Sequence, residues 1–353
     1  MMKTDGTMAS FERIVVRPPN WLGDAVLALP ALAALRRAFP GADLTVAAPA
    51  AVAAVFREET DAAPDHVLEL PASPAGIVAA LRGGRFDLAV LLPNSFRSAW
   101  MAWRARIPAR WGYAAGGRGW LLTRRVRPPR RSTRRHQAEY YRALVSGLGC
   151  EADASLLPRV GVSPASLARA DALLAGHGLP PDALLVGFAP GAAYGQAKQW
   201  PSDRMAALMA RVATSTAARC VLVGAAYDRP ASRAIESWLR AHAPEAADRV
   251  VDLVGRTSLG ALAGVAARTR VIVSNDSGAM HLAAALGRPV VALFGPTDER
   301  ATRPLGGHDV ILEDVFCRPC MLRDCPIDHR CMKRISVDRV FEAVVRRLAD
   351  RAA

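Results

Sequence analysis

Short apolar runs alternate along the chain with longer segments of helical pattern. In the first half, a β-branched run at residues 14–16 precedes a helical pattern at residues 24–39, and strand-like runs follow at residues 44–47 and 86–92. Continuous apolar runs bounded by Gly and Pro are typical of strands that are buried on both faces. The alternation predicts βαβ units, and therefore a parallel sheet with helices on both faces.

The second half repeats this rhythm after a helical connector at residues 160–178 and the Pro180-Pro181 pair, which marks a domain boundary. Its predicted elements are strands at residues 184–188, 220–223, 271–273 and 290–294, and helices at residues 204–214, 233–242 and 336–349. Between residues 100 and 135 the pattern weakens into a loop-like stretch. The simplest architecture is two doubly wound α/β domains that face a cleft.

Length and charge agree with this architecture. The chain has 353 residues, which suits two domains, and 51% apolar with 22% charged residues is an ordinary globular balance. Its 46 Lys and Arg against 32 Asp and Glu give a formal charge of +14. A positive field favours anionic partners such as nucleic acid, phosphorylated lipid or a nucleotide-linked substrate, without choosing among them.

The sequence also predicts a location. The N-terminal residues 1–19 show no apolar run after a basic start, so we expect no secretory signal. The longest apolar run, residues 25–35, contains Pro30 and is too short to cross a bilayer. We therefore expect a soluble, cytoplasmic protein whose six cysteines remain free thiols.

Three loops that follow predicted strands carry the candidate chemistry, because ligands of such sheets bind at the carboxyl ends of the strands. The first loop reads RPPNWLGDAV. Pro18 and Pro19 end the strand, and Gly23 allows the backbone to approach a ligand closely. Asp24 is either a helix cap or a general base that accepts a hydroxyl proton, and its place after the first strand favours the base.

The second loop, FAPGAAYGQAKQWP, follows the strand at residues 184–188. Gly191 and Gly195 flank small residues, and such loops expose backbone N–H groups toward phosphate. Lys198 is the one cation of this loop. It is either a solvated surface lysine or a positive charge beside a diphosphate leaving group.

The third loop lies in VIVSNDSGAMHLAAALGRPVVALFGPT, where a polar turn at residues 275–278 links a strand to a helix of small residues. The start of a helix is an anion site, because its first N–H groups have no partner within the helix. Asp276 is either a helix cap or an acceptor for a ribose hydroxyl, and His281 faces either the ligand or the core. The combination of strand, turn and helix favours nucleotide binding. No GxGxxG or Walker motif is present, which argues against a dehydrogenase or a P-loop enzyme.

Together these loops resemble the heptosyltransferases of glycosyltransferase family nine. NWLGDAVLALPAL, PGAAYGQAKQWP and SNDSGAMHLAAALGRPVVALFGPT look like that family's signature segments, in its order and spacing. The resemblance covers nearly the whole chain. The C-terminal CRPCMLRDCPIDHRCMKRISV is similar to the heptosyltransferase II branch rather than to the heptosyltransferase I branch.

The resemblance implies a GT-B fold with two Rossmann-like domains. Residues 1–175 would bind the acceptor, residues 180–335 would bind ADP-heptose, and the terminal helix at residues 336–353 would cross back to pack on the N-terminal domain. The implied activity is an inverting transfer of heptose from ADP-L-glycero-β-D-manno-heptose to the heptose of the lipopolysaccharide inner core, on a lipid A-Kdo-heptose acceptor. Neither a metal nor a cofactor would be needed.

The same resemblance implies roles for individual residues. Asp24 would be the base, and Lys198 would neutralise the leaving ADP. The residues implied for binding the sugar donor are Gly23, Gly191, Tyr194, Asp228, Asp276, Ser277, Gly278, Ala279 and His281, and those for the acceptor are Asn20, Trp21, Arg130, Arg131 and Arg134. Ala192 and Ala193 stand where some relatives have hydroxyl residues, so these two side chains offer phosphate no hydrogen bond.

Two further clusters allow more than one interpretation. Seven of the twelve residues at positions 124–135 are Arg, which fits a solvated loop, a nucleic-acid surface or an anionic acceptor. No nucleic-acid module is recognisable. The resemblance favours the acceptor's phosphates and Kdo carboxylates, with peripheral contact to the cytoplasmic face of the membrane. The cysteines at 317, 320, 325 and 331 contain one CxxC only, which favours free thiols over a zinc site.

Rival functions remain open from the residues alone. Another GT-B sugar transferase or a nucleotide-sugar epimerase would use the same loops. A basic RNA- or membrane-binding protein with an inactive cleft is a rival of another class.

Overall fold

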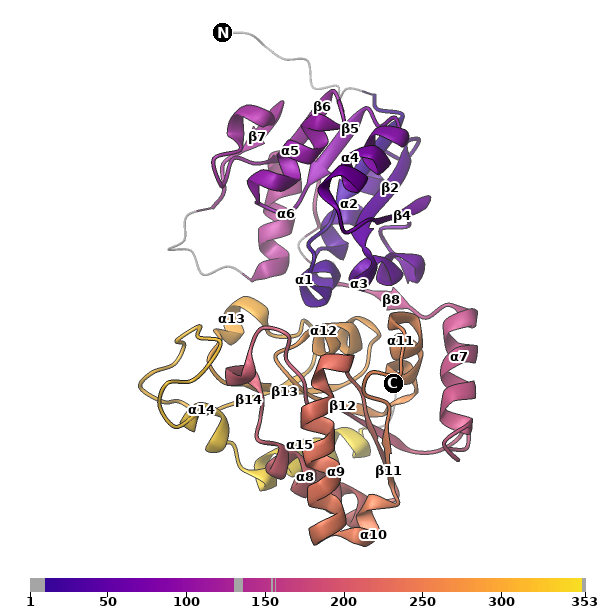
Figure 1. Cartoon of the computed structure of the whole chain (residues 1–353), viewed down its shortest axis with the longest axis vertical. Helices are drawn as coiled ribbons and strands as arrows, with labels where there is room; N and C mark the ends of the chain where they lie inside the picture. Colours follow the sequence, from indigo (N-terminus) through magenta and orange to yellow (C-terminus); the bar gives the residue numbers. More distant parts are fainter. Residues whose placement is uncertain (1–9, 130–135, 154, 156, 351–353) are drawn as a thin grey trace. The chain divides into compact units, whose positions relative to one another are not determined.

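The computed structural model describes residues 10–129, 136–153, 155 and 157–350. Its contacts divide the chain into two compact units, Met1–Pro158 and Arg159–Ala353. Each unit is built on one six-stranded sheet with helices packed on it (Figure 1). Neighbouring strands in both sheets run parallel, which confirms the predicted pair of α/β units.

The sheet of the first unit has the strand order β4-β2-β1-β5-β6-β7. Its strands are β1 (Arg13–Arg17), β2 (Asp43–Pro49), β4 (His66–Leu70), β5 (Leu88–Leu91), β6 (Ala109–Tyr113) and β7 (Arg124–Val126). The helices and short elements are α1 (Leu22–Leu27), α2 (Leu29–Ala38), α3 (Ala50–Ala53), η1 (Ala54–Arg57), β3 (Glu59–Thr60), α4 (Pro74–Gly83), α5 (Phe96–Arg104), η2 (Gly119–Leu121) and α6 (Gln137–Gly147).

The helix expected at residues 24–39 is two helices. It begins at Leu22, so that Asp24 lies within the first turn of α1, and it breaks at Ala28 before α2. Pro30 explains the break, because proline has no N–H to donate to a carbonyl of the preceding turn. The apolar positions of both helices are buried, from Ala25 to Leu35.

The sheet of the second unit has the strand order β11-β10-β9-β12-β13-β14. Its strands are β9 (Leu185–Ala189), β10 (Arg219–Leu222), β11 (Val250–Asp252), β12 (Val271–Asn275), β13 (Val290–Phe294) and β14 (Asp309–Leu312). The remaining elements are β8 (Val160–Gly161), α7 (Pro164–Ala175), η3 (Gln196–Lys198), α8 (Ser202–Ser215), η4 (Ala226–Asp228), α9 (Arg229–His242), α10 (Pro244–Ala247), α11 (Leu259–Arg268), α12 (Gly278–Ala285), α13 (Glu299–Thr302), α14 (Arg330–Lys333) and α15 (Val337–Ala349).

Strand order reverses once in each sheet, and the reversal places the candidate loops. In the second sheet the chain leaves β9 for β10 on one side and later returns to β12 on the other. The loops after β9 and β12 therefore meet at a topological switch point, where open α/β sheets bind ligands. In the first sheet the loop after β1 occupies the same position beside β5.

The boundary between the units lies earlier than the predicted residue 175. Residues 160–175 belong to the second unit because α7 packs along α11. Gly264 permits the close approach, since a Cβ at this position would lie 2.6 Å from the Cβ of Ala170 and 2.6 Å from the carbonyl oxygen of Ser166. This tight helix pair holds the connector onto the second unit.

The terminal helix α15 contributes to the core of the second unit, and its crossing to the N-terminal domain stays a prediction. It packs on α8, β12 and β13. Val340, Ala343 and Val344 join the apolar core of this unit, and the Arg211 guanidinium lies 4.0 Å from the Phe341 ring. Among the helices of the described ranges, none has the length and apolar character needed to cross a membrane.

Candidate active site

Asp24 lies in the first unit, directly after the carboxyl end of β1. It occupies the first turn of α1, and its side chain is half-buried. The hydroxyl of Tyr141 on α6 lies 3.3 Å from Asp24 Oδ1 and donates to it. Asn20 and Trp21 precede it, and the Trp21 side chain is 56% exposed. A carboxylate held by a hydroxyl beside an exposed aromatic face has the chemistry to accept a proton from a bound hydroxyl group.

The Tyr141 contact was not predicted from the sequence. Tyr141 is buried, and Gln137 Nε2 donates to its hydroxyl at 2.8 Å. Burial, followed by the negative charge of Asp24, raises the pKa of Tyr141 well above its usual value. The tyrosine therefore keeps its proton at neutral pH. Since Tyr141 and Asp24 are 117 positions apart, no local motif signals the contact.

Lys198 and Asp276 form the centre of the candidate site in the second unit. Lys198 Nζ donates to Asp276 Oδ2 at 2.6 Å, and both side chains are largely buried, with 13% and 5% exposed. Thr297 Oγ1, from the loop after β13, donates to the same oxygen at 2.8 Å. Asp276 Oδ2 thus positions the Lys198 ammonium, and a hydrogen bond from Asp276 to a ribose hydroxyl stays a prediction. Two loops that the sequence singled out thus converge on one carboxylate.

Asn275 fixes both ends of the Lys198 loop. Its Nδ2 donates to the carbonyl of Pro190 at 2.7 Å, and its Oδ1 accepts from the backbone N–H of Trp200 at 3.0 Å. The Asn275 side chain is fully buried. The last residue of β12 therefore sets the shape of the loop that carries Lys198.

The start of α12 borders this cluster. Ser277, Gly278 and Ala279 are partly exposed, whereas Met280 and His281 are buried. The first N–H groups of a helix lack partners within it, so they are available to an anion. His281 is buried, with 5% of the residue exposed, and its contact with the donor stays a prediction.

Gly191 and Asp228 are brought together after β9 and β10. A Cβ on Gly191 would lie 2.0 Å from the carboxyl carbon of Asp228, so only glycine fits there. Asp228 Oδ2 accepts the backbone N–H of Ala225 at 2.9 Å, and its Oδ1 has no hydrogen-bond partner among the described residues. Burial raises the pKa of Asp228. The Asp228 carboxyl group is thus packed against the loop after β9 at Gly191, with 6% of the residue exposed.

A C-terminal strap, defined here as residues 316–329 between β14 and α14, covers the Lys198 loop. The Tyr194 hydroxyl donates to the carbonyl of Met321 at 2.8 Å, and the backbone N–H of Ala197 donates to the carbonyl of Arg323 at 2.9 Å. His329 Nε2 lies 2.7 Å from the carbonyl oxygen of Ala197. The Tyr194 ring also lies 4.8 Å from Lys198 Nζ. The strap therefore holds the loop from its outer side.

Arg318 connects the strap to the Thr297 loop. Its guanidinium donates to the carbonyls of Gly295 and Thr297, at 2.7 and 3.0 Å, and pairs with Glu299 at 2.6 Å. Sequence reasoning missed this residue, because the density of cysteines around it directed attention to metal binding. The one signal in the sequence was that the strap has neither a helical nor a strand pattern, as expected of a segment that packs on other loops.

None of the six cysteines forms a disulfide: Cys317, Cys320 and Cys325 lie in the strap, Cys331 lies in α14, and Cys150 and Cys220 lie elsewhere. Burial, followed by the neighbouring thiols of the strap, raises the pKa of Cys331 to about 11. Within the described ranges, no three His, Cys, Asp or Glu side chains are arranged to hold a metal ion.

Of the candidate acceptor residues, the structure describes Asn20 and Trp21. Arg130, Arg131 and Arg134 lie outside the described residues. Just before them, the Arg124 guanidinium lies 4.9 Å from the Trp111 ring. Asp24 and Lys198 belong to different units, so their approach to a common ligand stays a prediction.

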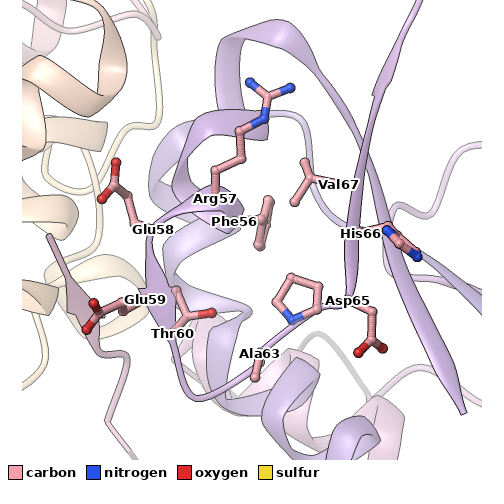
Figure 2. Close-up of a pocket in the computed structure, with 10 residues that line it drawn as sticks. Phe56, Arg57, Glu58, Glu59, Thr60, Ala63, Asp65, His66 and Val67 are labelled. Atoms are coloured by element: carbon pink, nitrogen blue, oxygen red, sulfur yellow. The ribbon is translucent and has the colours of Figure 1, made fainter. Parts of the chain in front are cut away.

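A pocket of the first unit lies elsewhere, between η1 and β4, and no predicted site residue lines it. Figure 2 shows that the side chains of Arg57, Glu59 and His66 point away from one another. Asp65 pairs with Arg36 and accepts the backbone N–H of Leu44 at 2.8 Å, which is the main cause of its lowered pKa. Arg57, Glu59 and His66 therefore do not converge on a common ligand.

Comparisons with known proteins point to one family. The family model of glycosyltransferase family 9 (heptosyltransferase) matches residues 76–330. Lipopolysaccharide heptosyltransferase 2 of Salmonella typhimurium is 33% identical over 312 residues, which cover 83% of this chain and 85% of that protein.

Solved structures extend this likeness to the fold. The structure of Escherichia coli ADP-heptose lipopolysaccharide heptosyltransferase II gives a TM-score of 0.81 at 29% identity and covers 95% of this chain and 98% of the other. An E. coli heptosyltransferase with ADP gives a TM-score of 0.69 at 21% identity, covering 95% and 99%, a likeness of fold alone. The expected GT-B fold is thereby confirmed. With a family match that spans most of the chain, the protein belongs to glycosyltransferase family 9 and is a glycosyltransferase.

Proposed function

We propose that this protein is a heptosyltransferase II-type enzyme. It moves heptose from ADP-L-glycero-β-D-manno-heptose to the heptose of a lipid A-Kdo-heptose acceptor and inverts the anomeric centre. The names of its relatives support this specificity, since the Salmonella protein is a lipopolysaccharide heptosyltransferase 2 and the E. coli structure is an ADP-heptose heptosyltransferase II.

The single observation that carries the mechanism is the buried contact between Lys198 and Asp276 beside the start of α12. When the anomeric C–O bond breaks, its electron pair leaves with ADP, and negative charge grows on the diphosphate. An ammonium and unpaired helix N–H groups stabilise such charge without a metal ion. The remaining donor contacts proposed are Gly23, Gly191, Tyr194, Asp228, Ser277, Gly278, Ala279 and His281.

Asp24 supplies the other half of the reaction. The acceptor hydroxyl oxygen forms the new bond to the anomeric carbon, and its proton goes to the Asp24 carboxylate. A single displacement of this kind inverts the configuration. Asn20, Trp21 and the arginines at 130, 131 and 134 bind the acceptor in this proposal, and the Arg-rich segment contacts anionic headgroups at the membrane surface.

The test is transfer from ADP-heptose to lipid A-Kdo acceptors that carry zero, one or two heptoses. We expect transfer to the acceptor with one heptose and little to the others. A preference for the acceptor without heptose would overturn the heptosyltransferase II assignment. Conversion of the sugar nucleotide without any acceptor would favour an epimerase, and tight RNA binding with no sugar-nucleotide turnover would favour a binding protein.

A further inference from the structure

The contact between Tyr141 and Asp24 assigns a role that goes beyond the proposed function, on which it rests. The Tyr141 hydroxyl lies between two polar groups, Gln137 Nε2 at 2.8 Å and Asp24 Oδ1 at 3.3 Å. The residue is 4% exposed, and both Gln137 and Tyr141 lie on α6. We propose that Tyr141 is a positioning residue that orients Asp24 and holds it as the carboxylate.

The direction of the two hydrogen bonds follows from the chemistry of the groups. An amide nitrogen is a donor only, so the Gln137 bond uses a lone pair of the tyrosine oxygen. The hydroxyl has one proton, and a carboxylate oxygen accepts only. That proton is therefore directed at Asp24. A hydrogen bond to the charged form of an acid favours this form, so Tyr141 keeps Asp24 ready to accept a proton.

The described helices that pack on α1 carry few titratable groups besides Tyr141. The helices packed on α1 are α2, α3 and α6. Helix α3 has no titratable side chain, and α2 carries only Arg36 and Arg37, in its last turn. The titratable and charged groups of α6 are Glu139, Tyr140, Tyr141 and Arg142, with His136 at its N-cap. Of these, the structure shows a hydrogen bond to Asp24 from Tyr141.

The contacts around Tyr141 hold its ring in one orientation. His136 Nδ1 caps α6 by accepting the backbone N–H of Ala138 at 3.2 Å. The neighbouring Tyr140 ring lies 6.0 Å from the Tyr141 ring, and Tyr140 accepts from Asn94 Nδ2 at 2.7 Å. Packing thus locks the ring of Tyr141 and leaves its hydroxyl directed at the base.

The experiment compares Tyr141→Phe with Tyr140→Phe, which removes a neighbouring hydroxyl that bonds to Asn94. We expect Tyr141→Phe to lower kcat on the order of 10-fold, as for loss of one hydrogen bond to a charged group. The acid limb of its pH–kcat/KM profile should move to higher pH, because the carboxylate loses a donor. KM for ADP-heptose should stay unchanged, and Tyr140→Phe should keep the wild-type profile.

A double-mutant cycle distinguishes positioning from structural support. In an Asp24→Asn background, Tyr141→Phe should have no further effect on the residual rate. If Tyr141→Phe fails to fold, Gln137→Leu takes its place, with a smaller shift in the same direction. An unshifted acid limb in a folded variant, or an equal rate loss in both backgrounds, would overturn the inference. Failure of the wild-type protein to transfer heptose would instead refute the proposed function.

Discussion

The carboxylate site of the first unit and the cation site of the second differ in how much the protein itself holds in place. Asp24 is half-buried, stands beside an exposed tryptophan and receives a long hydrogen bond from Tyr141. Lys198 is enclosed by Asp276, by the Asn275 clamp on its loop and by the strap. In the proposed mechanism, contacts within the chain hold the leaving-group site around Lys198, whereas the proposed base stands beside an exposed aromatic side chain.

The largest expected effect comes from substituting Asp24, the proposed base. Asp24→Asn should lower kcat by about 10²- to 10⁴-fold, since the amide cannot accept the proton. The melting temperature should change little, because the side chain is half-buried and keeps a similar shape. Rate measurements at saturating substrates check this, and a loss below 10-fold would show that another group is the base.

Substitutions at Lys198 and Asp276 should have the next largest effect on kcat. Lys198→Ala should lower kcat on the order of 100-fold, because growing diphosphate charge loses its ammonium. Asp276→Asn should produce a smaller loss, since the lysine remains but is less well held. In the double variant the two losses of kcat should not add, because both substitutions act through one contact. Additive losses would mean that Asp276 acts on the ligand independently of Lys198.

The strap offers a test of the idea that the second site is held from outside. Arg318→Met leaves Glu299 without its buried partner and should cost about 2 kcal/mol of stability. It should also weaken ADP binding, because the Thr297 loop loses its anchor. Arg300→Met is the matched control, since the Arg300–Asp298 pair is exposed on the arginine side and should contribute little. Equal ADP affinity in both variants, measured calorimetrically, would contradict a role for the strap.

The smallest effect concerns Asp228, whose pKa is raised by burial. The folded state then binds more protons than the unfolded state between the two pKa values, so this group lowers stability as pH rises through that window. Asp228→Asn should remove this loss and keep the bond from Ala225. Denaturant melts from pH 4 to 8 test this. An unchanged pH dependence would mean that Asp228 is not the group that titrates.

Much of the fold was predictable because the alternation of apolar strands and helices is strong in both halves. The sequence did not predict that α7 packs along α11, since an amphipathic pattern shows that a face is buried but does not show which element covers it. It also missed the break between α1 and α2 that Pro30 imposes.

The candidate loops were predictable for a similar reason, because each directly follows a strand. The partners of their side chains were not. Lys198 and Asp276 are 78 positions apart, and Tyr141 reaches Asp24 across 117. Arg318 contacts the Thr297 loop from a segment whose cysteines suggested another chemistry. Contacts of this kind arise from folding, and no spacing in a single sequence encodes them.

The most direct test of the account is the structure of the product formed from ADP-heptose and an acceptor with one heptose. Mass spectrometry and NMR of the wild-type product should show one added heptose with inverted anomeric configuration and one ADP released per transfer. A retained configuration, or free heptose in place of product, would contradict a single displacement assisted by Asp24.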